Sequence, residues 1–181
     1  MRVVAGTFGS RPIKTLKGDT TRPTTDKVRA AIFNRIGPFF NEGKMLDVFG
    51  GSGAMALESI SRGIEHAVVF EKDVRAYNVI RDNIKTFDLE GCVQLKKGDS
   101  MKLLETVSGS FEFVFLDPPY RYEHTLEIIK IIIKRNLVAE DGLIICETDK
   151  NYDLPDVIDG FYLDCVKDYG ISKVRYYKKD N

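Results

Sequence analysis

Short apolar runs alternate with segments of helical periodicity along most of this chain, and this alternation constrains the fold more than any other feature. Five runs have the length and composition of buried strands: residues 44–49, 66–71, 92–99, 111–117 and 142–147. The segments between them that show helical spacing are residues 53–63, 73–87 and 124–137. Strand and helix in turn predict right-handed crossovers and a mostly parallel sheet covered on both faces. The expected fold class is therefore α/β.

The two ends of the chain depart from this alternation. Residues 24–40 indicate a capped helix that starts at Thr24 or Thr25, and residues 6–23 before it predict strand and loop. Residues 161–170 and 172–179 alternate in polarity and are separated near Gly170, which is typical of an antiparallel pair closing the sheet. We find no repeat or linker, so one domain is expected, with a basic N-terminal extension and helix over 1–40 and a core over 41–181.

Composition excludes several classes of protein. No apolar run approaches the roughly 20 residues that cross a bilayer, and the first ten residues have no signal-peptide core. Cys92, Cys146 and Cys165 show no paired spacing and are expected to be reduced thiols in a cytoplasmic protein. His66 and His124 lie far apart with no cysteine nearby, which argues against a metal site.

The charge is unevenly distributed although its formal sum is zero. Residues 1–35 carry eight Lys and Arg against two Asp, and residues 172–181 carry four against one. The middle of the chain is correspondingly acidic. A basic N-terminus on an acidic body favours a polyanion partner, although an ordinary solvated basic stretch fits the charge equally well.

A glycine-rich loop follows the first central run in the sequence LDVFGGSGAMALE. Gly50, Gly51 and Gly53 permit a tight turn and close approach of a ligand to the backbone, and Glu71 lies 20 residues beyond Gly51, where an acid can bind ribose hydroxyls. The loop alone is compatible with NAD(P), with S-adenosyl-L-methionine, or with a tight turn that binds nothing.

Acidic residues at successive strand ends favour S-adenosyl-L-methionine. Asp47 precedes the glycines, where a carboxylate would repel a pyrophosphate but attract a cationic amino acid group. Glu71, Asp99 and Asp117 end the following runs. Because ligands of open α/β sheets bind outside the carboxyl ends of the strands, these four acids predict one shared crevice.

The run FLDPPY, residues 115–120, suggests the chemistry at that crevice. Two prolines stiffen the backbone after the strand. Asp117 and the carbonyl of Pro118 could accept hydrogen bonds from an exocyclic amino group, and Tyr120 could stack on the ring of the base. This arrangement would orient a weakly nucleophilic amine toward a methyl donor without a metal or a nucleophilic side chain.

At these motifs the chain resembles class I S-adenosylmethionine-dependent methyltransferases that act on amino nitrogens. RPTTDKVRAAIFN at 22–34, with the glycine loop and FLDPPY, resembles the RsmD-type family, the bacterial 16S rRNA guanine-N2 methyltransferases. The resemblance spans nearly the whole chain. One departure is Gly50, where the family loop usually has Ala.

The resemblance implies a seven-stranded Rossmann-like fold, an S-adenosyl-L-methionine cofactor and methylation of N2 of a guanine in small-subunit ribosomal RNA. It also implies a substrate within an assembly particle, no membrane or metal, and a monomer. The implied catalytic residues are Asp117, Pro118, Pro119 and Tyr120. The implied cofactor-binding residues are Asp47, Phe49, Gly50, Gly51, Ser52, Gly53, Glu71, Lys72, Asp99, Ser100 and Asp117. The residues expected to contact RNA are Arg2, Arg11, Lys14, Arg22, Pro23, Thr24, Arg29 and Tyr120.

Three alternatives remain open from the sequence. An adenine-N6 methyltransferase on DNA or RNA would use the same DPPY chemistry. An NAD(P)-dependent oxidoreductase would use the same glycine loop, although no catalytic Tyr-x-x-x-Lys motif or paired His and Asp is evident; Tyr169 and Lys173 have the spacing but flank the expected turn at Gly170. A non-catalytic RNA-binding module could retain the fold.

Overall fold

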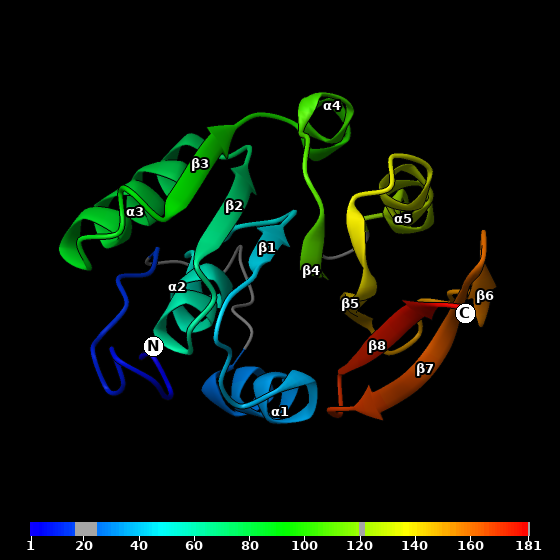
Figure 1. The fold of residues 1–181 in the computed structure, drawn as a ribbon, viewed down its shortest axis with the longest axis horizontal. Helices are drawn as coiled ribbons and strands as arrows, with labels where there is room; N and C mark the ends of the chain where they lie inside the picture. Colours follow the sequence, from blue (N-terminus) through cyan, green and yellow to red (C-terminus); the bar gives the residue numbers. More distant parts are fainter. Residues whose placement is uncertain (17–24, 120–121, 181) are drawn as a thin grey trace.

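The computed structural model describes residues 1–16, 25–119 and 122–180, and within them eight strands form one sheet (Figure 1). The strands are β1 Lys44–Asp47, β2 His66–Glu71, β3 Val93–Lys97, β4 Phe111–Leu116, β5 Val138–Asp149, β6 Val157–Ile158, β7 Phe161–Asp168 and β8 Ser172–Lys179. Their order across the sheet is β3-β2-β1-β4-β5-β8-β7-β6. The first five strands pair with one another in parallel, and β5, β8, β7 and β6 pair antiparallel in that order. The α/β class and the antiparallel C-terminal pair are confirmed.

The sheet has one strand more than the seven expected. The additional strand β6 has two residues and pairs with β7 at the edge of the sheet. Two residues are too few to produce an alternating pattern, so the sequence gives no signal for this strand.

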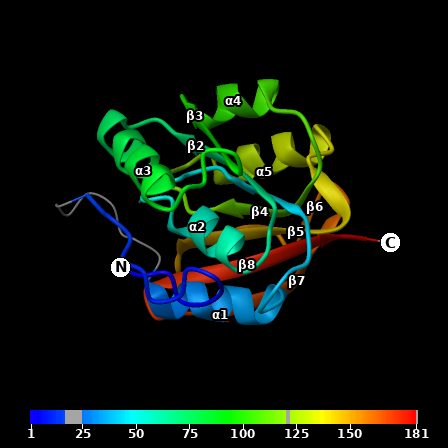
Figure 2. The same cartoon turned by 60° about the vertical axis from the view of Figure 1, so that its left-hand side comes forward.

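Helices cover both faces of the sheet (Figure 2). They are α1 Asp26–Ile36, α2 Ala54–Ser61, α3 Val74–Thr86, α4 Ser100–Thr106 and α5 Thr125–Lys134. One apolar cluster joins α1, α2 and α3 to the sheet through side chains such as Phe33, Leu57 and Ile80. A second cluster joins α4 and α5 to the opposite face through Leu104, Ile128 and Ile132. The result is three layers with a core on each side of the sheet.

The predicted starts of α1 and α3 are confirmed, and each has a side chain that caps the helix. Thr25 is the N-cap of α1, and its Oγ1 accepts a hydrogen bond from the Val28 amide. Asp73 caps α3 by accepting from the amides of Arg75 and Ala76. These oxygens satisfy amides that have no partner within the helix.

The helix α4 was absent from the sequence prediction. It has seven residues, and its N-cap is Asp99, whose Oδ1 accepts from the Met101 amide. Asp99 therefore starts a helix two residues after β3 ends, instead of ending the strand itself. A helix of two turns is too short to show a clear apolar period.

The N-terminal segment, residues 1–16, contains no regular strand and makes one bridge, between Arg2 and Pro12. Val3 and Ile13 are buried in the core below α2 and α3. The backbone of the segment is bound by side chains of α2: Glu58 accepts from the amides of Val4 and Ala5. Of residues 6–23, which the sequence predicts to form strand and loop, the structure describes residues 6–16, which form loop with a single bridge residue, Pro12.

Two expectations from composition concern the cysteines and the membrane. Cys92, Cys146 and Cys165 are free thiols, and Cys146 is buried. No helix within residues 1–16, 25–119 and 122–180 is both long and apolar enough to cross a bilayer.

Candidate functional site

The carboxyl ends of the parallel strands place acidic side chains along one edge of the sheet. Asp47 ends β1, Glu71 ends β2, and Asp117 directly follows β4. β1 lies between β2 and β4, and Asp47 is in register with Phe115, two residues before Asp117. The chain leaves β1 toward β2 on one side and returns to β4 on the other, so this is the switch point where open α/β sheets bind ligands.

Asp47 is the most buried of these acids, with 1% of its surface exposed. Burial raises the pKa of this carboxyl well above the ordinary Asp value, and the nearby charges of Asp117 and Glu71 raise it further. A single bond from the Phe49 amide, 3.3 Å from Oδ1, opposes this shift. Three acids converging on one buried position favour a cationic ligand, because a cation would stabilise carboxylates that otherwise repel one another.

Glu71 holds the glycine loop against β2. Its Oε2 accepts from the Gly51 amide at 2.9 Å, and its Oε1 accepts from the Asp73 amide at 2.7 Å. Burial raises the pKa of Glu71, whereas the bonds from Asp73 and Gly51 oppose that rise. A carboxylate has about four acceptor positions, so Glu71 can also accept from a hydroxyl while its bonds to backbone amides support the loop.

The glycine loop folds tightly onto the neighbouring strands. Gly51 and Gly53 have positive φ values of 58° and 79°, which glycine adopts without strain. The Gly50 amide donates to the Phe70 carbonyl at 2.8 Å, and the Gly53 amide donates to the Gly50 carbonyl at 2.7 Å. A Cβ built on Gly51 would meet no atom within 4 Å, so open space borders the loop at that residue. The loop therefore has room for a ligand close to its backbone.

Gly50 is packed much more tightly than Gly51. A Cβ at Gly50 would lie 2.6 Å from Val69 Cγ1 and 2.8 Å from Ile80 Cδ1. These two side chains fill the space that an alanine methyl would occupy. Glycine at position 50, where the family loop usually has Ala, therefore fits the packing around it.

The residues after β4 form the opposite wall of this edge. Asp117 and Pro118 are partly buried and Pro119 is exposed. The Pro119 carbonyl accepts from the Tyr122 amide at 3.0 Å, which turns the chain toward α5. Tyr120, expected to stack on a base, lies outside the described residues.

Tyr122 is a site residue that the sequence interpretation missed. Its ring packs edge to face on Phe49 with centroids 5.3 Å apart, and it contacts His124 on its other side at 5.7 Å. Burial raises the pKa of the Tyr122 hydroxyl, and the charge of Asp99 raises it further. The ring thus connects the loop after β1, the cap of α4 and the segment after β4. The only signal for it was a second aromatic residue two positions beyond Tyr120.

Lys72, Asp99 and Ser100 lie on the β3 side of the edge. Lys72 Nζ is 3.1 Å from Asp99 Oδ2, and this bond lowers the pKa of the Asp99 carboxyl. The Ser100 hydroxyl donates to the Val48 carbonyl at 2.7 Å. Asp99 is accessible to a ligand, whereas the Ser100 hydroxyl already ties α4 to the loop after β1.

Three of the residues expected to contact RNA lie on the N-terminal segment. Arg2 and Lys14 are exposed, and Arg11 is partly exposed. Arg11 stacks 4.1 Å from the Phe87 ring centroid, and Lys14 Nζ is 2.7 Å from Asp82 Oδ2. Arg22, Pro23 and Thr24 lie outside the described residues.

Arg29 is the one member of that set that the structure corrects. Its surface is 0% exposed, and its guanidinium pairs with Glu58 in the interior and with Asp26. It also donates to the Arg2 carbonyl. Glu58 is a buried carboxylate bound to two arginines, Arg29 and Arg62, so Arg29 is required as a counter-charge and cannot reach RNA.

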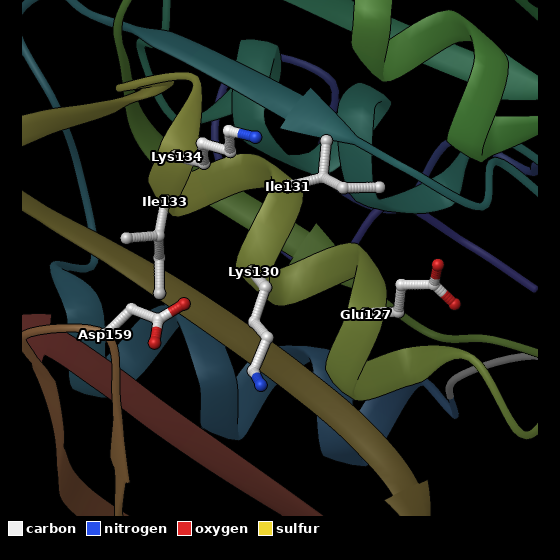
Figure 3. A pocket seen from close by; sticks show the side chains of 6 residues that line it. All are labelled: Glu127, Lys130, Ile131, Ile133, Lys134 and Asp159. Carbon is white, nitrogen blue, oxygen red and sulfur yellow. The ribbon is translucent and has the colours of Figure 1, made fainter.

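A separate hollow of about 400 Å³ lies beside α5, between that helix and the turn before β7 (Figure 3). It is lined by Glu127, Lys130, Ile131, Ile133, Lys134 and Asp159. None of these residues belongs to the carboxylate edge. Among the described residues, no group of three or more His, Cys, Asp or Glu side chains is arranged to hold a metal ion.

Comparisons with known proteins agree with this fold. The family model described as conserved hypothetical protein 95 matches residues 1–178. The Bacillus subtilis protein named putative rRNA methyltransferase YlbH is 36% identical over 182 residues and covers 99% of both chains. Ribosomal RNA small subunit methyltransferase D of Escherichia coli K12 is 29% identical, over 99% of this chain and 90% of its own.

Solved structures give the same result. The putative methyltransferase yhhF from Escherichia coli superposes with a TM-score of 0.87 at 30% identity, over 99% of this chain and 98% of its own. The methyltransferase PaMTH1 of Podospora anserina, solved with SAH bound, is 16% identical over 76% of this chain and 72% of its own, and its TM-score of 0.62 shows a shared fold. The mostly parallel sheet with an antiparallel end is thus the class I methyltransferase fold. The match over residues 1–178 and the 36% identity along almost the whole chain show that this protein belongs to the family described as conserved hypothetical protein 95, the RsmD-type methyltransferases.

Proposed function

We propose that this chain is an S-adenosyl-L-methionine-dependent methyltransferase that methylates the exocyclic N2 amino group of a guanine in small-subunit ribosomal RNA. The observation that carries the proposal is the position of Asp117 and Pro118 after β4, in electrostatic reach of buried Asp47 and beside the glycine loop. The relatives' names supply the substrate class, since they denote rRNA methyltransferases.

The residues present fit the proposed cofactor. Asp47 offers a buried carboxylate that a cationic amino acid group would stabilise, and Gly51 leaves open space beside the loop backbone. Glu71 keeps acceptor positions for ribose hydroxyls. Asp99 can accept from an adenine amino group. When bound, this cofactor supplies an activated methyl group on a positively charged sulfur.

The chain's own contribution to the reaction is orientation. An amino group attached to a base is a weak nucleophile because its lone pair is delocalised into the ring. Asp117 and the Pro118 carbonyl would accept from its two N–H groups, which localises the lone pair and directs it at the methyl carbon. The bound cofactor would supply the methyl group, and its sulfur would keep the electron pair of the bond that is broken. The methylated nitrogen would then lose a proton, and we assign Asp117 as its acceptor.

Several finer features belong to the same proposal. The chain acts as one methyltransferase domain and as a monomer in the cytoplasm. Its substrate is rRNA within a small-subunit assembly particle, where the target base is splayed from its stack. Tyr120 is assigned to stacking on that base.

The test begins with binding of SAH to the purified chain, followed by nucleoside analysis of 16S rRNA and small-subunit particles incubated with labelled S-adenosyl-L-methionine. N2-methylguanosine is the expected product. N6-methyladenosine would identify an adenine-N6 enzyme. Binding of NAD(P) without binding of SAH would identify an oxidoreductase, and RNA binding without turnover of any substrate would identify a non-catalytic module. Each of these three results overturns the proposal.

A further inference from the structure

Asn83 connects the N-terminal segment to the glycine loop. It lies on α3 with 2% of its surface exposed. Its Nδ2 donates to the Lys14 carbonyl at 2.9 Å and to the Ser52 carbonyl at 3.0 Å, and its Oδ1 accepts from the Lys14 amide at 3.0 Å. One buried amide thereby binds the backbone of two segments that are distant in sequence.

The orientation of this amide is determined by its partners. Both donors of the Nδ2 group face carbonyl oxygens, and the Oδ1 atom faces an N–H. Turning the amide over would place Oδ1 against a carbonyl and Nδ2 against the Lys14 amide, with repulsion at both positions. No side chain but Asn supplies two donors and one acceptor at this length, so the residue type is specified by the geometry.

The two segments that Asn83 joins are assigned to the two ligands of the proposed reaction, the glycine loop to the methyl donor and the N-terminal segment to RNA. Ser52 lies between Gly51 and Gly53 in the loop assigned to the methyl donor. Lys14 belongs to the N-terminal segment, whose charged side chains are Arg2, Arg11 and Lys14, with no acidic residue in positions 1–16. A second contact, from Ser52 Oγ to Met1 Sδ at 3.5 Å, also joins them.

Helix α3 and its C-cap also bind two of the three basic side chains of the segment, those of Arg11 and Lys14. Arg11 donates to the Thr86 carbonyl at 2.7 Å and stacks on Phe87, which caps α3, and Lys14 pairs with Asp82. The Lys14 pair is solvent-exposed, so a phosphate could replace Asp82 with little loss. RNA bound at these cations would thus act on a segment whose backbone is tied to the glycine loop through Asn83.

We infer that Asn83 is a positioning residue that couples the N-terminal RNA-contact segment to the cofactor loop, so that RNA and cofactor each strengthen the binding of the other. The inference rests on the proposed function. Because coupling between two binding equilibria is reciprocal, the factor by which RNA tightens cofactor binding must equal the factor by which the cofactor tightens RNA binding.

The experiment measures both affinities in the full chain. SAH is titrated with and without saturating unmethylated 16S rRNA, and the rRNA is titrated with and without saturating SAH. In the wild type we expect each ligand to tighten the other about fivefold or more. In Asn83→Asp, which is isosteric but lacks both donors, we expect the factor to fall to within about twofold of unity while each ligand still binds alone.

Two further variants separate positioning from stability. Ile84→Ala removes a buried apolar side chain of the same helix but leaves the three hydrogen bonds of Asn83 in place, and should retain the wild-type coupling factor. Asn83→Ser is a milder change for use where Asn83→Asp lowers the folded fraction, and should also lose coupling.

The outcomes distinguish the inference from the proposed function. If SAH or rRNA fails to bind the wild type at all, the proposed function is wrong. If both bind but independently in the wild type, or if Asn83→Asp and Asn83→Ser keep the wild-type factor, the coupling inference is wrong and the function stands. Loss of coupling in Ile84→Ala as well would assign the effect to general stability and would also overturn the inference.

Discussion

At the scale of single residues, the candidate site is a set of acids with unequal environments. Asp47 is buried, Glu71 is engaged by two amides, and Asp99 is paired with Lys72. The sequence identified all of these acids because each falls at or just after the end of an apolar run. It could not show that Arg29 is interior, because a basic residue on a helix looks the same whether it binds phosphate or neutralises a buried carboxylate such as Glu58.

Asp117 is implied as both a catalytic and a cofactor-binding residue, and we expect its substitution to affect turnover far more than cofactor binding. Asp117→Ala removes the carboxylate that would orient the amine, so we expect kcat to fall by about a hundredfold or more. SAH affinity, measured by calorimetry, should change less than about threefold. Asp153→Ala, at an exposed position, is the control and should keep wild-type kcat. Methylation by Asp117→Ala at the wild-type rate would remove Asp117 from the mechanism.

Asp47 is expected to make the ligand-free protein less stable as pH rises. Because burial raises its pKa in the folded state, the folded protein binds this proton more tightly than the unfolded chain does. The associated stability is present below the ordinary Asp pKa of about 4 and is lost as pH rises through the raised value. Asp47→Asn should therefore raise Tm at neutral pH and flatten its decline as pH rises above the ordinary Asp pKa.

The measurement for Asp47 is a series of thermal melts without ligand, together with an SAH titration. Glu71 is shifted in the same direction, so the slope should decrease without vanishing. Weaker SAH binding in Asp47→Asn should accompany the gain in stability. An unchanged pH slope would show that Asp47 is not the group responsible.

At the scale of elements, the sequence predicted those with strong local signals. β2 was predicted residue for residue, and the Asp that starts α3 is its N-cap. β5 extends from Val138 to Asp149, well beyond the apolar run at 142–147, because β4 pairs with it at Val138 and β8 pairs with it as far as Asp149. Pairing of this kind is a tertiary effect that no local pattern reports.

The turn after β1 should not tolerate a methyl group. Gly50→Ala would force Val69 and Ile80 to move, and we expect the free energy of unfolding to fall by about 1–3 kcal/mol in urea titrations. Gly91→Ala is the matched control, since a Cβ there meets nothing within 4 Å. Adding Ile80→Val, which removes the Cδ1 atom, should restore part of the loss. Full stability in Gly50→Ala alone would mean that the loop can shift.

Among the polar residues of α2, Glu58 is the one whose substitution we expect to lower the free energy of unfolding most. Glu58→Gln leaves the Arg29 and Arg62 guanidinium groups buried without their shared counter-charge. We expect a loss of about 3–5 kcal/mol in the free energy of unfolding, measured by urea titration. Glu65→Gln, at an exposed position, should change stability by less than about 0.5 kcal/mol. A small effect at Glu58 would show that water or Asp26 compensates.

At the scale of the whole molecule, charge is segregated between the two ends and the body of the chain. The N-terminal segment lies on the α2 and α3 side, whereas α5 covers the opposite face of the sheet. The fold class and the edge that bears the site could be predicted, because alternation and strand-end acids are repeated signals. The anchoring of residues 1–16 could not, because it depends on buried side chains of other elements, Glu58 and Asn83.

RNA binding should depend on salt through the exposed cations of the N-terminal segment. Arg2→Gln is expected to weaken binding of 16S rRNA and to reduce the slope of log affinity against log salt by about one, because one phosphate contact is lost. SAH affinity should not change. Lys134→Gln on α5 is the control and should leave the slope as in the wild type. An unaltered slope in Arg2→Gln would exclude this residue from the RNA interface.

The order of the strands has a consequence for how copies of this chain behave in concentrated solution. The sheet is bordered by β3 on one side and by β6 on the other. β6 offers only two residues for pairing, and β3 carries Lys96 and Lys97 near its end. A short border and a positively charged border are both poor templates for a strand from another copy. Beyond the two residues that β6 covers, β7 forms the border and carries the charged residues Asp164, Lys167 and Asp168. Edge-to-edge aggregation is therefore disfavoured at both borders by charge, even though the sheet does not close into a barrel.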